Sequence, residues 1–306
     1  MVIMQQMFIL MIIMMVGLVA QKRNIITDEA GKKLSSLVVN ISNPCLIITS
    51  VLDGSDMIKR KELLEILMIA IVVYIVLMVI AAFIPVLLRV PESEYGVYRA
   101  MTVFSNIGFM GLPLVSAVYG KEALLYAAVF SFPFNFLVYT YGVYVLQGKE
   151  GKIQKIQWKM LLNPGIIATV IAILIYLTDF SLPYIVGSSI DMIGNTTSPL
   201  SMMIIGASFA NIDFKTVFTN KKLLLFSLIK LVIIPVAGLF VIHYFIDNTV
   251  IQGVCLIMLA TPVASMVVML ANEYGGDTKL GSAGIAVTSV LSVFTLSALA
   301  YLGFGS

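Results

Sequence analysis

The sequence is poor in charged residues, in cysteine and in histidine. Of its 306 residues only 11% are Asp, Glu, Lys or Arg, whereas 60% are hydrophobic. This composition excludes a soluble globular domain and indicates a membrane protein. The formal net charge is only +3, and no basic patch is large enough to bind nucleic acid. The two cysteines, Cys45 and Cys255, lie in apolar segments without metal-ligand spacing, so we expect buried thiols and no metal site.

The same scarcity argues against an intramembrane enzyme. A serine hydrolase needs an activated serine, but the sequence has no G-x-S-x-G motif, and the single histidine, His243, falls near the end of an apolar segment. An aspartyl enzyme needs two carboxylates that face each other within the membrane. Asp191 and Asp277 are expected at opposite faces of the membrane. We therefore expect no enzymatic activity, and no cofactor is implied.

About ten apolar segments are long enough to cross a hydrocarbon core of about 30 Å. Residues 1–20 lack a basic region and a small-residue cleavage site, so they are interpreted as a first spanning helix rather than a signal peptide. We predict an all-α integral membrane protein with a single transmembrane domain over 1–306. Its helices are expected near 2–20, 34–52, 63–88, 97–119, 124–147, 161–178, 184–210, 222–245, 250–272 and 280–303.

The basic residues predict the orientation of these helices. If successive loops alternate sides, fourteen Lys and Arg fall on one side and four on the other, and Lys230 lies inside the eighth helix. Cytoplasmic loops carry the excess of Lys and Arg. The counts place the loop around 148–160 in the cytoplasm and both termini outside, in a plasma or inner membrane.

Proline positions reveal a weak internal repeat. Residues 40–44 read N-I-S-N-P and residues 195–199 read N-T-T-S-P, while Pro113 and Pro262 are each followed by a Tyr-Gly pair. The matching helices lie five apart, an odd number, so the two halves enter the membrane in opposite directions. We predict two inverted five-helix repeats, at about 1–150 and 158–306.

The fourth and ninth helices are predicted to break within the membrane. The fourth contains Gly108, Gly111 and Pro113 in an uncharged stretch, and the ninth contains Thr261-Pro262. We expect the second halves to begin at the two prolines, and their N-termini to attract an anion without a fixed cation beside it. The carbonyl ends of the first halves remain for a cation or water. Paired broken helices are typical of the binding site of a secondary transporter.

Two sets of side chains are candidates for this site. Asn106 either contacts the cargo or bonds another helix, and the hydroxyls of Thr261 and Ser265 either contact it or bond back to the preceding turn. The substrate-binding candidates are Asn106, Gly108, Gly111, Pro113, Thr261, Pro262 and Ser265. The candidates for ion or proton coupling are Asn43, Asp191, Asn195, Ser198 and Lys230.

The coupling candidates also have simpler interpretations. Two matched polar clusters, Asn40, Ser42 and Asn43 on one helix and Asn195, Thr197 and Ser198 on another, either coordinate a coupling ion or cap two proline breaks. Asp191 either takes a proton or sodium ion or lies at the membrane surface. Lys230 is expected to face protein or water, where it takes part in pairing or in proton coupling.

Several motifs resemble the auxin efflux carrier family, which includes plant PIN carriers and bacterial malate permeases. The matching residues are Ser105-Asn106, Gly111-Leu112-Pro113-Leu114, Tyr119-Gly120, Asn163-Pro164, Pro262 and Ala271-Asn272-Glu273-Tyr274. The resemblance implies a crossover fold in which the fourth and ninth helices cross, elevator-like alternating access, and an organic anion as cargo. The chain lacks the long loop of the plant carriers between the fifth and sixth helices, so a hormone cargo is not implied.

The sequence thus predicts a secondary carrier of a small organic anion such as malate. An anion-selective channel and a non-transporting scaffold or receptor remain the alternatives. The expected partners are the anion, the lipid bilayer, H⁺ or Na⁺ as a coupling ion, and a second copy of the chain in a homodimer.

Overall fold

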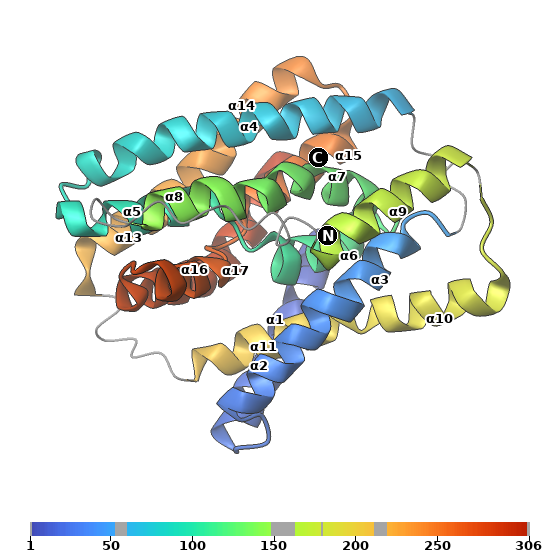
Figure 1. The fold of residues 1–306 in the computed structure, drawn as a ribbon, viewed down its shortest axis with the longest axis horizontal. Helices are drawn as coiled ribbons and strands as arrows, with labels where there is room; N and C mark the ends of the chain where they lie inside the picture. The colour runs from blue at the N-terminus through green and yellow to red at the C-terminus, as the bar shows by residue number, and fades with distance from the viewer. Residues whose placement is uncertain (1, 53–59, 148–162, 179, 211–218, 305–306) are drawn as a thin grey trace.

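The computed structural model describes residues 2–52, 60–147, 163–178, 180–210 and 219–304. Its first helices are α1 (Val2–Lys22), α2 (Asp28–Leu37), α3 (Asn43–Thr49), α4 (Arg60–Leu87), α5 (Tyr95–Val103), α6 (Leu112–Tyr119), α7 (Ala123–Leu137) and α8 (Val143–Leu146). The second half contains α9 (Pro164–Thr178), α10 (Tyr184–Asn195), α11 (Thr197–Phe209), α13 (Lys221–Leu228), α14 (Ile234–Phe245), α15 (Thr249–Ala260), α16 (Met266–Tyr274) and α17 (Thr278–Phe304) (Figure 1). The basic loop predicted around 148–160 lies outside the described residues.

The long helix α4 shows the surface that the composition predicts. Ile66, Ala70 and Tyr74 face the protein, whereas Met68, Val72 and Phe83 are exposed. An apolar outer face on a helix that is apolar all round is stable only against lipid. Within the described ranges, four helical stretches are long and apolar enough to cross a membrane, and they span 60–87, 123–146, 221–245 and 278–296. Ten spans in two inverted repeats therefore stay a prediction.

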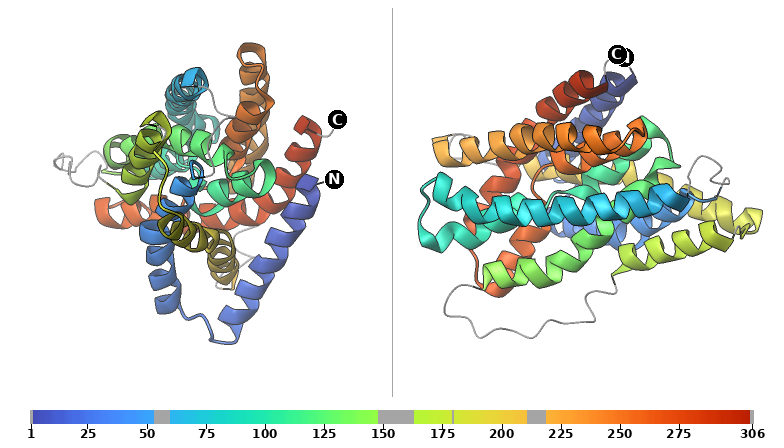
Figure 2. Two further views of the ribbon diagram at one scale, coloured as in Figure 1. Left: turned by 90° about the vertical axis from the view of Figure 1, so that its right-hand side faces the viewer. Right: turned by 90° about the horizontal axis from the view of Figure 1, so that it is seen from above.

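The helices pack in two sets. In the first, the flanking group (2–49 and 164–209), α1 packs on α11 and α3 packs on α9 and α10. In the second, the crossing group (60–146 and 221–304), α4 packs on α5 and α7, α14 on α15, and α16 on α17. The groups meet where α7 contacts α9 and α1 contacts α17. The start of α1 and the end of α17 accordingly lie near each other (Figure 2).

Three prolines are accommodated by wide helical turns rather than by breaks. The turns η1 (Val38–Ser42), η3 (Ile107–Gly111) and η6 (Ile229–Ile233) are π-helical, and Pro44, Pro113 and Pro235 each follow two residues later. In each case the residue before the proline donates its N–H to a carbonyl five residues earlier. A wider turn relieves the contact between a proline ring and the carbonyl one turn earlier. The prediction that the fourth helix breaks at Pro113 is therefore wrong.

Candidate functional site at the crossing of two helix breaks

The break in the fourth predicted helix lies at Phe104–Asn106, well before Pro113. Helix α5 ends at Val103, and Phe104 is extended, with φ −95° and ψ 103°. Asn106 caps the next helical turn because its Oδ1 accepts a hydrogen bond from the N–H of Phe109 at 3.4 Å. Ser and Asn are residues that favour such capping positions. The second half-helix thus begins at Ile107 and continues through η3 and α6.

The break in the ninth predicted helix lies at Thr261–Ser265 and includes the predicted proline. Helix α15 ends at Ala260, and Thr261 is extended, with φ −64° and ψ 149°. A residue that precedes a proline avoids the helical region, which explains the end of α15 at this point. Helix α16 begins at Met266 with Ser265 before it. The second half therefore starts four residues after Pro262 and not at it.

The two breaks are bonded directly to each other. Ser105 and Val263 form an isolated antiparallel bridge. The N–H of Asn106 donates to the carbonyl of Pro262 at 2.7 Å, and the N–H of Ala264 donates to the carbonyl of Phe104 at 3.0 Å. These bonds satisfy backbone groups that lipid cannot satisfy. The crossing therefore joins four half-helices, two of which end there and two of which begin there.

Thr288 of α17 supports the second break and is not among the residues predicted for the site. The N–H of Val263 donates to its Oγ1 at 3.1 Å, and that hydroxyl donates to the carbonyl of Gly284 at 2.7 Å. Thr288 is buried. Its position among the hydroxyl residues of an otherwise apolar helix was the available signal, but nothing in the pattern shows which hydroxyl faces the break.

Lys230 is the only charged side chain buried in the described part of the chain, with an exposed fraction of 0%. Its ammonium donates to the carbonyl of Thr102 at 2.8 Å and to the Oγ of Ser105 at 2.7 Å. Thr102 lies in the last turn of α5, so the ammonium sits at the carbonyl end of this half-helix. A cation therefore stands at the crossing, and the prediction that the cargo has no fixed cation beside it stays a prediction.

Asn43 of α3 approaches the crossing from the flanking group. Its Nδ2 donates to the carbonyl of Gly108 at 3.2 Å. Its Oδ1 is buried and accepts no hydrogen bond. A Cβ at Gly108 would lie 3.4 Å from the amide nitrogen of Asn43, which is van der Waals contact. A buried acceptor without a donor is costly and marks a place that a ligand or water would complete.

The remaining substrate-binding candidates differ in how far they are buried. Gly111 and Pro113 are buried, and Gly111 lies in the π-helical turn. Thr261 is buried and its hydroxyl donates back to the carbonyl of Met258 at 3.0 Å, which is the simpler of its two interpretations. Ser265 is exposed, and its side chain does not cap α16. Of these side chains only that of Ser265 is open to the surroundings.

The first polar cluster contacts Thr196, which lies between two members of the second. Ser42 Oγ and Thr196 Oγ1 lie 3.0 Å apart and join η1 to the junction of α10 and α11. The Nδ2 of Asn40 donates to the carbonyl of Ser36 at 2.8 Å. Thr197 is buried and its hydroxyl has no partner, whereas Ser198 is half-buried. The first cluster does not cap a break, because the helix continues through η1 into α3.

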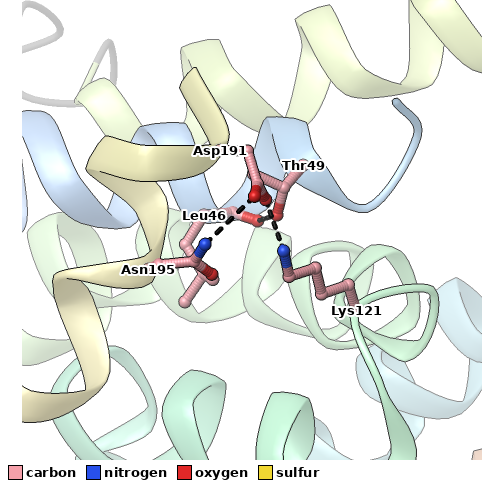
Figure 3. Close-up of polar contacts among 5 residues, drawn as sticks. All are labelled: Leu46, Thr49, Lys121, Asp191 and Asn195. Atoms are coloured by element: carbon pink, nitrogen blue, oxygen red, sulfur yellow. Dashed lines mark hydrogen bonds and ion pairs between the residues drawn. The ribbon is translucent and has the colours of Figure 1, made fainter. Parts of the chain in front are cut away.

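A second polar contact joins the two packing groups. Lys121, between α6 and α7, forms an ion pair with Asp191 of α10, with Nζ and Oδ1 2.5 Å apart. The Nδ2 of Asn195 donates to the other carboxylate oxygen of Asp191 at 3.0 Å (Figure 3). Both members of the ion pair are about one-third exposed, at 36% and 34%. Asp191 and Asn195 were predicted near each other; the partner Lys121 was not predicted, because it comes from a distant loop.

The known proteins that this chain resembles are described as membrane transporters. A profile of proteins described as "Membrane transport protein" matches residues 2–300. The chain is 23% identical over 298 residues to an uncharacterized transporter of Methanocaldococcus jannaschii, which covers 94% of this chain and 95% of the relative. It is 21% identical over 296 residues to the uncharacterized transporter YfdV of Escherichia coli K12, covering 94% and 93%. A "Putative malonate transporter" of Rhizobium meliloti is 24% identical over 213 residues, which are 65% of this chain and 64% of that protein.

Proposed function

We propose that this chain, a member of the membrane transport protein family of auxin efflux carriers, is a secondary carrier that moves a small organic anion across a cell membrane. The family is one of membrane transporters, and the apolar helices make the chain a multi-pass membrane protein. The relative named for malonate favours a small dicarboxylate such as malonate or malate as cargo.

The observation that carries the proposal is the crossing of the two breaks. The half-helices that begin at Ile107 and Met266 bring two N-termini, with their partial positive charge, to the crossing. Such ends bind carboxylates. The open hydroxyl of Ser265 lies directly before the second of these ends and can donate to a carboxylate, whereas the unpaired Oδ1 of Asn43 needs a donor such as water. We assign the cargo to the neighbourhood of Asn106, Gly108, Thr261, Pro262 and Ser265, and assign Gly111 and Pro113 to the shape of the half-helix.

The two packing groups support transport by alternating access. The crossing belongs to one group, and Asn43 reaches it from the other. A displacement of the crossing group relative to the flanking group would expose the cargo first on one side of the membrane and then on the other. The inverted five-helix repeats, both termini outside, the plasma or inner membrane and a homodimer belong to this proposal.

Transport in proteoliposomes tests the proposal. Vesicles that contain the purified protein are loaded with unlabelled malonate or malate and diluted into a trace of the labelled anion. A carrier exchanges internal for external substrate, so label accumulates transiently above its outside concentration and uptake saturates. Protein-free vesicles and vesicles loaded with malonamide serve as controls.

Other outcomes identify the alternatives. An anion channel would equilibrate label without transient accumulation and without saturation. A scaffold or receptor would give no uptake above the protein-free control with any carboxylate of a small panel. Either result would contradict the proposed carrier.

A further inference from the structure

The charges at the crossing are not balanced. Two half-helices, α5 and α15, end there and present carbonyls with about half a negative charge each. Two others begin there with the opposite sign, so the helix ends alone cancel. Lys230, when protonated, adds a positive charge at the end of α5. No ion pair to Lys230 forms within the described ranges, so this charge remains without a carboxylate partner.

The ammonium of Lys230 lies where a coupling cation would bind, at the carbonyl end of a half-helix. In broken transporter helices the carbonyl ends of half-helices coordinate Na⁺ or protons. Here the carbonyl of Thr102 and the hydroxyl of Ser105 are both taken by Lys230 Nζ. Ser105 also forms the bridge to Val263, so the ammonium stands beside the bond between the two breaks.

The other carbonyl ends have donors of their own. The hydroxyl of Thr261 donates to the carbonyl of Met258 at 3.0 Å in the last turn of α15. The carbonyls of Phe104 and Pro262 accept the N–H groups of Ala264 and Asn106. These acceptor oxygens of the crossing are thus satisfied within the protein, whereas Asn43, whose Nδ2 donates to the carbonyl of Gly108, keeps an unpaired Oδ1.

We propose that Lys230 is a built-in cation, fixed at the carbonyl end of α5 in place of a coupling sodium ion. The crossing then carries net positive charge without a bound metal ion, and the carrier works without Na⁺ while it prefers an anion to a neutral analogue. Lys230 acts as a positioning residue through the break and does not itself contact the cargo. The cargo preference rests on the proposed function, but the sodium independence does not.

The first test compares cations and variants in proteoliposomes. Uptake of labelled malonate by the parent is measured in Na⁺ and in N-methylglucamine at equal pH on both sides, and should agree within about twofold. The inhibition by malonate relative to malonamide is measured for the parent and for Lys230→Met. Loss of the fixed charge should lower that ratio by about tenfold or more. Lys221→Met makes the same change at an exposed lysine in the first turn of α13 and should keep the parental ratio.

Two results would overturn the inference: parental uptake that requires Na⁺, or a Lys230→Met variant that keeps the parental preference for the anion. If Lys230→Met does not insert, the sodium comparison on the parent still decides. If the parent carries no carboxylate at all, the proposed function fails, and the melting temperature of the purified parent tests the inference separately. Specific stabilisation by Na⁺ over N-methylglucamine would then contradict it, and an equal melting temperature in both would support it.

Discussion

Asn106 joins the backbone of one break to the N-terminal end of the next half-helix. Its N–H bonds Pro262, its carbonyl accepts from Met110 and Gly111, and its Oδ1 caps Phe109. The side chain therefore has a structural task whether or not a cargo is present. A useful variant must keep the cap and change only the charge.

We predict that Asn106→Asp folds and inserts like the parent but binds a carboxylate less well, by about 1 kcal/mol or more. Aspartate is as good a helix cap as asparagine, while its charge repels an anion at the same place. Asn106→Ala loses the cap as well, which costs about 1 kcal/mol of stability. Melting temperature and malonate competition are measured on both variants. An Asn106→Asp variant that binds malonate as well as the parent does would contradict an anion site beside Asn106.

Residue by residue, the sequence predicted which side chains were unusual but not what they contact. Lys230 and Asp191 were identified because charge in an apolar segment is rare. Their partners, Ser105 and Lys121, lie 125 and 70 residues away along the chain. Contacts of that range are set by the packing of helices, which no local pattern encodes. The hydroxyl of Thr261 illustrates the opposite case, because its bond to the preceding turn is local.

At the scale of elements, prolines have two different effects in this chain. Pro262 lies in a true break, whereas Pro113 lies in a helix that continues through a π-helical turn. A proline pattern predicts an irregularity in both helices but cannot distinguish a widened turn from an interruption. The interruption at Phe104–Asn106 depends on the bridge to Val263, which is a tertiary contact.

The two prolines should therefore respond differently to replacement by alanine. Pro262→Ala removes the constraint that holds Thr261 extended and favours a continuous helix, so malonate uptake should fall by about tenfold or more. Pro113→Ala lies in a helix already formed, where alanine is the better residue by about 3 kcal/mol, and should keep most of the uptake. Uptake is compared at equal amounts of inserted protein. An equal loss of uptake in both variants would contradict the different roles assigned to Pro262 and Pro113.

A pair of glycines brings α1 and α11 into backbone contact. A Cβ at Gly206 would overlap the carbonyl of Met14, and a Cβ at Gly17 would overlap that of Met203. Small residues allow such close approach of membrane helices. We predict that Gly206→Ala destabilises the protein by about 1 to 3 kcal/mol through overpacking.

Gly31→Ala is the matched control, because nothing lies within 4 Å of a Cβ there. Alanine in the interior of α2 should be neutral or favourable by about 1 kcal/mol. Melting temperatures in detergent compare the two. A Gly206→Ala variant as stable as Gly31→Ala would show that α1 and α11 can accommodate a methyl group without loss of stability.

At the scale of the whole molecule, the fold class and the order of helical segments were predictable because each apolar run is long and local. The division into a flanking and a crossing group was not, since it depends on which distant helices pack together. This division gives the ion pair of Lys121 with Asp191 its significance. The pair joins the two groups, so relative movement of the groups should break it.

An ion pair this exposed is worth about 0 to 1 kcal/mol, and 1 kcal/mol changes a two-state ratio about fivefold. We predict that Lys121→Ala and Asp191→Asn each shift the balance between conformations by up to about that factor. The double variant Lys121→Asp with Asp191→Lys should restore part of the parental balance. The readout is the labelling rate of a single cysteine at the crossing. A charge-swapped variant no closer to the parent than the single variants would show that the pair does not couple the groups.

The most direct measurement is substrate protection at the crossing itself. In a variant with Cys45→Ala and Cys255→Ala, a single Ser265→Cys is labelled with a thiol reagent, and Ser36→Cys on exposed α2 serves as the control. If a carboxylate binds between the half-helix ends, malonate should slow labelling at 265 and malonamide should not, while labelling at 36 is unaffected by either. Labelling at 265 that malonate leaves unchanged, or that malonamide slows equally, would contradict an anion site at the crossing.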